Sequence, residues 1–135
     1  MEIFEPYAHA IASMAGFSVL MLVLGGLSTR GRTAENRAPS GLVKRDYSDP
    51  AYRSGRAFMN AVESGAPFAM ALLAAMLTGG SPFWVNVFAA VFLLARIATA
   101  YVHIATENQA MRSATWAVGF FCILALGLIG LIGAF

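Results

Sequence analysis

Residues 53–67 read RSGRAFMNAVESGAP and open the second of four hydrophobic segments in a chain of 135 residues. On a helix, Arg56, Asn60 and Glu63 share one face because they are spaced four and three residues apart. Pro67 removes the amide that would bond the carbonyl of Glu63, so a fault in the helix lies beside this polar face. Ionisable groups at membrane depth almost always face a partner, a cavity or a ligand. The stretch therefore marks a candidate functional site.

The composition around this stretch is typical of a membrane protein. Hydrophobic residues make up 59% of the chain and charged residues only 12%. All but Arg96 and Arg112 of the nine Lys and Arg residues lie between residues 30 and 56. The net charge of +2 is therefore a topology signal, and no nucleic-acid partner is expected. The single cysteine, Cys122, cannot form a disulfide within the chain.

The hydrophobic segments predict an all-α fold, an integral membrane four-helix bundle that forms a single domain over residues 1–135. Each segment is about as long as is needed to cross a hydrocarbon core of about 30 Å. A signal peptide is a poor reading of the first segment, because Glu2 and Glu5 precede it and it exceeds the usual h-region of about 15 residues. The predicted helices cover residues 6–29, 52–78, 83–105 and 111–133.

The basic block falls in one long loop, residues 30–51, which the positive-inside rule places in the cytoplasm. Both termini then lie on the non-cytoplasmic side, and we expect a bacterial inner membrane. The loop charges either serve topology alone or, in the case of Arg30, reach an anionic ligand. Glycines near the end of the last segment are expected to pack against another helix, and aromatic residues near the outer surface, Tyr7, Phe83 and Trp84, to anchor the chain there.

Depth relates the polar residues of different helices to one another. Glu63 and Arg96 both lie about 15 Å from the loop-side ends of their helices. An isolated charge at that depth costs about 3 kcal/mol, so we expect an ion pair between them, within the chain or across subunits. Excess cations predict an anionic ligand with more than one carboxylate. The resulting cytoplasmic wedge comprises Arg56, Asn60, Glu63, Arg96, His103, Arg112, Ser113 and Trp116.

This pattern resembles the MAPEG family, the membrane-associated proteins in eicosanoid and glutathione metabolism. The likeness rests on R-A-x-x-N-x-x-E-x-x-x-P from Arg56 to Pro67, on Arg96 in the third segment, and on Arg112-Ser113-x-x-Trp116 at the start of the fourth. It covers residues 5–133. The resemblance implies a homotrimer of four-helix subunits, with glutathione bound as co-substrate between subunits and a lipophilic substrate that approaches from the membrane lipids.

The resemblance also implies roles for individual residues. Arg56, Asn60 and Glu63 would hold the backbone and termini of glutathione, and Arg112 is similar to the catalytic arginine beside the sulfur. The physical case for Arg112 is independent, because the thiolate is the nucleophile, a free thiol titrates near pH 8.5, and a nearby cation favours the thiolate. Ser113 either donates a hydrogen bond to sulfur or caps the fourth helix.

The chain departs from the family pattern at several positions. His103 stands where a tyrosine is usual and either takes over its hydrogen bonding or faces lipid headgroups. Trp116 also replaces a tyrosine and either covers the hydrophobic substrate or sits in the interfacial aromatic belt. Phe58 and Met59 replace polar or basic residues of the eicosanoid-handling members. These changes alter the expected ligand cage.

The favoured function is a membrane-bound glutathione transferase or peroxidase that acts on lipophilic electrophiles or hydroperoxides. No His/Cys cluster with metal-ligand spacing is present, so no metal is expected. The alternative is a non-catalytic lipid-binding protein, as some family members are, or a structural subunit of a larger membrane complex.

Overall fold

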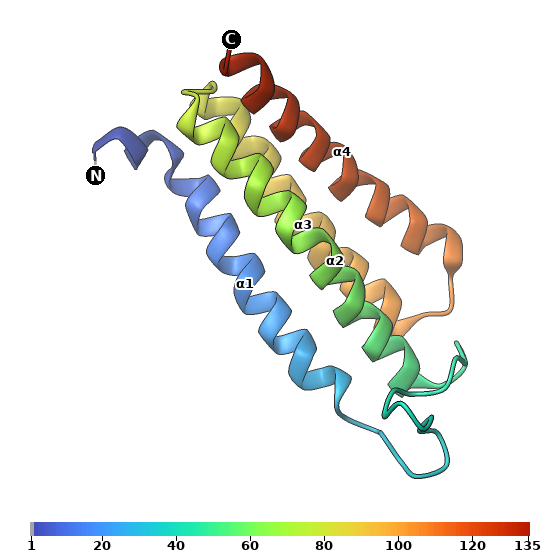
Figure 1. Ribbon diagram of the computed structural model, residues 1–135. Coiled ribbons are helices and arrows are strands. Elements are labelled where there is room, and N and C mark those ends of the chain that lie inside the picture. Colours follow the sequence, from blue (N-terminus) through green and yellow to red (C-terminus); the bar gives the residue numbers. More distant parts are fainter. Residues whose placement is uncertain (1) are drawn as a thin grey trace.

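The computed structural model describes residues 2–135, which form four long helices and one short helical turn. In chain order they are η1 (Glu2–Tyr7), α1 (Ala8–Ser28), α2 (Pro50–Leu77), α3 (Pro82–Ala105) and α4 (Gln109–Gly133) (Figure 1). All four α-helices are long and apolar enough to cross a membrane. Apart from one isolated bridge between Arg37 and Val43, residues 2–135 contain no strand pairing. The prediction of an all-α four-helix bundle is confirmed.

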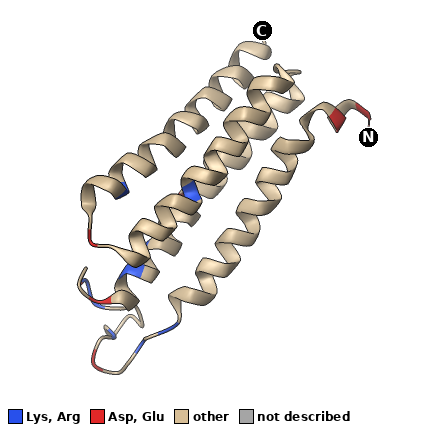
Figure 2. Cartoon of the chain, turned by 180° about the vertical axis from the view of Figure 1, so that it is seen from behind, with Lys and Arg blue, Asp and Glu red and all other residues tan. Residues whose placement is uncertain are grey.

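The four helices run side by side, with α1 and α4 on opposite flanks of α2 and α3 (Figure 1). Both termini lie at one end of the bundle, which we call the terminal end. The connections 29–49 and 106–108 lie at the other end, the loop end. Figure 2 shows Lys and Arg gathered mainly toward the loop end, with one further basic position midway along the bundle. This arrangement brings the starts of α2 and α4 close to the end of α3.

The centre of the bundle is an aromatic cluster. The rings of Phe68 on α2 and Phe92 on α3 stack at 3.8 Å between centroids, and Phe17 of α1 packs edge-on against both at 5.8 and 5.0 Å. All three side chains are buried. Such pairs add about 0.5–1.5 kcal/mol beyond area burial. The cluster therefore fixes α1, α2 and α3 relative to one another.

Glycines bring α4 close to α2 toward the terminal end. A Cβ added at Gly130 would lie 2.8 Å from the Cβ of Ala74, and one at Gly133 would lie 2.7 Å from Oγ1 of Thr78. Small residues allow this close approach of two helix backbones. The predicted packing role of these glycines is confirmed.

The N-terminal turn is tied to the α2–α3 connection. The buried Tyr7 hydroxyl donates a hydrogen bond to the carbonyl of Gly80 at 2.5 Å, and the Asn86 side chain donates to the carbonyl of Pro6 at 2.7 Å. Tyr7 was expected to be an aromatic anchor at the membrane surface. That expectation is wrong, because the ring is buried and its hydroxyl has a partner within the chain. Phe83 and Trp84, by contrast, are exposed.

The long loop is held in place at the start of α2. The Asp49 carboxylate accepts from the amide of Ala51 at 2.7 Å and caps the helix, and Pro50 occupies its first turn. Asn36 donates to Asp49 at 3.0 Å and to the carbonyl of Gly31 at 2.9 Å. These bonds explain why α2 begins two residues before the hydrophobic segment that predicted it.

Candidate functional site

A cavity of about 520 Å³ opens between α2, α3 and α4 at the loop end. Its volume lies within the range of about 300–1,000 Å³ that is usual for ligand sites. Five residues predicted from the sequence lie around it, together with three that were not predicted. The lining of this Arg112 cavity consists of Tyr47, Asn60, His103, Gln109, Arg112, Ser113, Trp116 and Ala117.

The Arg112 guanidinium forms the cationic part of the cavity. Its central carbon lies 4.3 Å from the centre of the Tyr47 ring, which is a cation–π contact. Its Nη1 atom is buried and has no hydrogen-bond partner among the described residues. A buried donor without a partner is costly, so an acceptor brought to this nitrogen would be favourable.

His103 lies on the wall that α3 contributes. Its side chain is 7% exposed, and its Nδ1 atom is buried without a hydrogen-bond partner among the described residues. A headgroup-facing histidine would be exposed at the helix end, so that alternative is wrong for this chain. A ring nitrogen of His103 can instead donate to, or accept from, a ligand in the cavity.

Ser113 and Trp116 project from the first turns of α4. Ser113 is exposed in the cavity wall, and the cap of α4 is Asn108, whose side chain accepts from the amide of Met111 at 3.0 Å. The capping alternative for Ser113 is therefore wrong, because α4 begins at Gln109 rather than at residue 111. Trp116 stacks on Phe120 at 5.3 Å between centroids.

A second cavity of about 210 Å³ lies deeper, and Glu63 and Arg96 both line it. Arg96 is only 3% exposed, and its Nη2 atom donates to the backbone carbonyl of Asn60 at 3.2 Å and to the Asn60 side-chain oxygen. Asn60 and Trp116 also line this Glu63 cavity, so it adjoins the Arg112 cavity.

The expected ion pair between Glu63 and Arg96 is not formed within residues 2–135. The ion pair in this part of the chain joins Arg53 to Glu107. The prediction that Glu63 and Arg96 lie at a similar depth agrees with their shared cavity. The Arg96 guanidinium, however, donates its hydrogen bonds to Asn60, and the Glu63 side chain is exposed on α2. The prediction of a Glu63–Arg96 ion pair within one chain is therefore wrong, and an ion pair between subunits stays a prediction.

Arg56 faces a different cavity, of about 300 Å³, which also includes Arg32. Tyr47 lines the Arg112 cavity and Tyr52 lines the Arg56 cavity, and their rings meet edge-to-face at 5.1 Å. The pair of rings lies between the two cavities and divides the single wedge that was expected. Arg30 is exposed just after α1 and lines none of these three cavities.

A sequence model of the MAPEG family matches residues 10–132. The chain belongs to the MAPEG family. No curated protein matches it. Family membership and four membrane-spanning helices together make it an integral membrane protein.

This MAPEG chain also carries site residues that sequence reasoning missed. Tyr47 lies in a loop, where no helical period relates it to Arg112, and Gln109 falls in a stretch that was assigned to the connection. The only signal for Gln109 was Asn108 just before it, which is a strong helix cap. Nothing in the spacing pointed to Tyr47. No group of three His, Cys, Asp or Glu side chains in residues 2–135 could hold a metal ion.

Proposed function

We propose that this protein is a membrane-bound glutathione-dependent transferase or peroxidase that acts on lipophilic electrophiles or hydroperoxides. The observation that carries the proposal is that Arg112 lines an open cavity together with Ser113 and His103, while one of its guanidinium nitrogens is buried without a hydrogen-bond partner among the described residues. Membership of the MAPEG family, which includes glutathione transferases and related proteins, supports the same reaction class.

Arg112 would act by favouring the thiolate form of glutathione. A thiol pKa lowered by two units needs about 2.7 kcal/mol of preferential interaction, which one partly desolvated guanidinium can supply. The Ser113 hydroxyl would add a hydrogen bond to the sulfur. The thiol proton leaves to solvent, the sulfur lone pair forms a carbon–sulfur bond, and the leaving group departs with the bonding electrons.

With a hydroperoxide, the thiolate sulfur attacks the terminal oxygen, the oxygen–oxygen bond breaks, and the alkoxide takes a proton from solvent and leaves as an alcohol. A second glutathione then reduces the sulfenic acid to disulfide and water.

The remaining site residues would bind the peptide part of glutathione. Arg56 and Arg112 line separate cavities in the single chain, and two separated cations suit the two carboxylates of this tripeptide. We propose that Arg56, Asn60, Glu63, Arg96, His103 and Trp116 complete the ligand cage in a homotrimer, with the loop end in the cytoplasm of a bacterial cell. The trimer would let a neighbouring subunit close the open sides of the cavities.

The test of this function compares wild-type protein with Arg112→Ala in the conjugation of glutathione to a chlorinated dinitrobenzene. We expect a rate about 100-fold lower at pH 6.5, as is typical when one charge-stabilising donor is removed. The pH at which the rate begins to rise should move upward by about two pH units, because the thiol regains its free pKa. Arg37→Ala is the matched control, because Arg37 is exposed in the loop and lines none of the cavities described.

Equal rates for wild type and Arg112→Ala would reject the catalytic assignment. Calorimetric binding of glutathione without turnover would favour a lipid-binding member of the family. Stoichiometric partners that co-purify after mild solubilisation would favour a structural subunit of a larger complex.

A further inference from the structure

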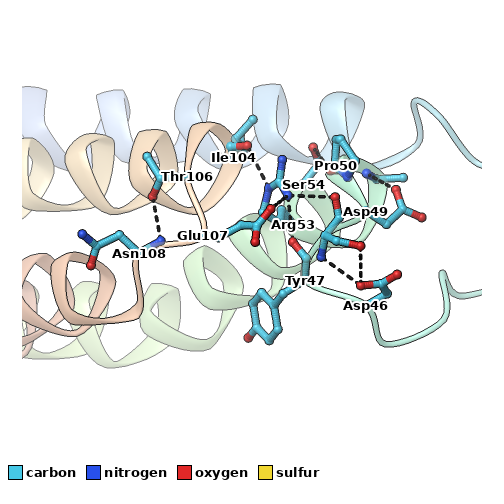
Figure 3. Close-up of polar contacts among 12 residues, drawn as sticks. Asp46, Tyr47, Asp49, Pro50, Arg53, Ser54, Ile104, Thr106, Glu107 and Asn108 are labelled. Carbon is cyan, nitrogen blue, oxygen red and sulfur yellow. Dashed lines mark hydrogen bonds and ion pairs between the residues drawn. The ribbon is translucent and has the colours of Figure 1, made fainter.

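Arg53 joins three segments of the chain at the loop end (Figure 3). Its Nη1 atom donates to the carbonyls of Tyr47 at 2.7 Å and Ser48 at 3.0 Å, and its Nε atom donates to the carbonyl of Ile104 at 3.2 Å. Nη1 also lies 3.4 Å from the Glu107 carboxylate. The Arg53 side chain is only 11% exposed. These contacts hold the loop beside the α3–α4 connection, where Glu107 precedes Arg112 by five residues.

A second set of bonds fixes the same part of the loop from the other side. The Asp46 carboxylate accepts from the amide of Ser48 at 2.9 Å and from its hydroxyl at 2.8 Å. These hydrogen bonds lower the pKa of Asp46 below its usual value, so the ionised carboxylate and its bonds to Ser48 persist to more acidic pH than an unbonded carboxylate would. The backbone of Tyr47, which lies inside this turn, is therefore held in one position.

The Tyr47 ring contacts both Arg112 and Tyr52. Its face is 4.3 Å from the Arg112 guanidinium carbon, and its contact with Tyr52 is edge-to-face, with an interplanar angle of 87°. The ring face, rather than the phenol hydroxyl, makes the contact with the cation. An aromatic face that covers one face of a guanidinium leaves the nitrogens at its edge for planar hydrogen bonding.

We propose that Tyr47 is a positioning residue for Arg112, and that Arg53 sets the place of Tyr47. The ring fixes the plane of the guanidinium so that its edge faces the cavity, where it meets the anionic sulfur of the thiol. Without the ring, the guanidinium turns toward solvent and favours the thiolate less. This inference rests on the proposed function of Arg112. It adds a loop residue to a site otherwise built from helices.

The test measures the pKa of the bound thiol from the ultraviolet absorbance of the thiolate, in purified protein with glutathione. Tyr47→Phe and Tyr47→Trp keep an aromatic face and should retain the wild-type pKa. Tyr47→Leu and Tyr47→Gln remove the ring and should raise the pKa by about one unit, which lowers the rate at acidic pH about tenfold. The matched control is Tyr101→Leu, because Tyr101 is 69% exposed on α3 and lines none of the cavities described.

Arg112→Ala is measured beside these variants and separates the two proposals. A raised pKa in Arg112→Ala together with an unchanged pKa in a folded ring-less variant overturns the role of Tyr47 alone. An unchanged pKa in Arg112→Ala overturns the proposed function and the role of Tyr47 with it. A raised pKa in Tyr47→Phe also overturns the inference, because the hydroxyl would then matter more than the ring. Two ring-less variants are used so that poor folding of one leaves the other.

Discussion

Arg96 is a buried cation without a carboxylate partner within residues 2–135. Its charge is compensated by two oxygen atoms of Asn60, and its guanidinium carbon lies 6.0 Å from the centre of the Phe92 ring. Its Nε atom is buried without a hydrogen-bond partner among the described residues. Asn60 therefore has two tasks, because the same side chain holds Arg96 and lines the Arg112 cavity. A change at Asn60 acts on stability as well as on the site.

Asn60→Ala should destabilise the protein by about 2–3 kcal/mol, because it leaves a buried guanidinium without its side-chain acceptor. Asn60→Asp should keep the acceptor and retain most of the stability. Arg96→Met in the Asn60→Ala background should regain part of the loss, since the unpaired charge is removed as well. Thermal unfolding in detergent measures all three variants. A double variant less stable than Asn60→Ala would show that Arg96 has a compensating group elsewhere.

Site residues could be predicted from the sequence only where they lie on a helix, because helical spacing then shows which of them share a face. Spacing along a helix correctly predicted that Asn60, Arg112 and Trp116 lie around one cavity, and the family pattern supplied the role that we propose for Arg112. Spacing gives depth along a helix but not which neighbour a side chain reaches, and so the pairing of Glu63 with Arg96 was wrong within the chain. Tyr47 could not be found, because its place depends on the loop bonds to Arg53 and not on any period.

The contact between α2 and α4 depends on small residues rather than on interlocking large ones. Gly130 lies so close to α2 that an added Cβ would be 2.9 Å from backbone atoms at residues 74 and 75. Backbone atoms cannot move aside as a flexible side chain can. The separation of these helices, which together form a wall of both polar cavities, is thus set near the terminal end of α4.

Gly130→Ala should destabilise the protein by about 1–3 kcal/mol, because the methyl group forces α4 away from α2. Gly26→Ala is the matched control, since a Cβ there meets no atom within 4 Å. On helix propensity it should be neutral or stabilise the protein by up to about 1 kcal/mol. Thermal unfolding of the two variants side by side tests the expectation. Equal melting temperatures for the two variants would mean that α4 can move away from α2 without loss of stability.

Helices as elements were predictable because length and apolarity alone identify a membrane span. Their starts were less predictable, because Asp49 and Asn108 are polar residues that belong to the helix as caps. Both α2 and α4 accordingly begin two residues before their predicted starts. The turn η1 was not predicted at all. Its position depends on the distant contacts of Tyr7 with Gly80 and of Asn86 with Pro6, which no local pattern reveals.

For the molecule as a whole, the exposed side of α2 combines apolar side chains with one acidic group. Met59, Val62 and Met70 are exposed there, and so is Glu63. With a rise of 1.5 Å per residue, Glu63 lies about 20 Å from the start of α2, which is near the middle of a hydrocarbon core. A carboxylate that faced lipid at that depth would cost a few kcal/mol. This surface is therefore the one that the proposed trimer would cover.

Glu63→Leu distinguishes a covered surface from one that faces lipid. If a neighbouring subunit supplies a partner for the carboxylate, the substitution breaks a buried pair and should weaken the trimer by roughly 3 kcal/mol. Native mass spectrometry should then show trimers for wild type and a larger share of monomers for the variant. Met70→Leu, an apolar exchange on the same exposed helix, should leave the distribution unchanged. A carboxylate that faces lipid gives the opposite sign, because its removal raises the melting temperature and leaves the assembly as it was. That result would rule out Glu63 as part of a subunit interface.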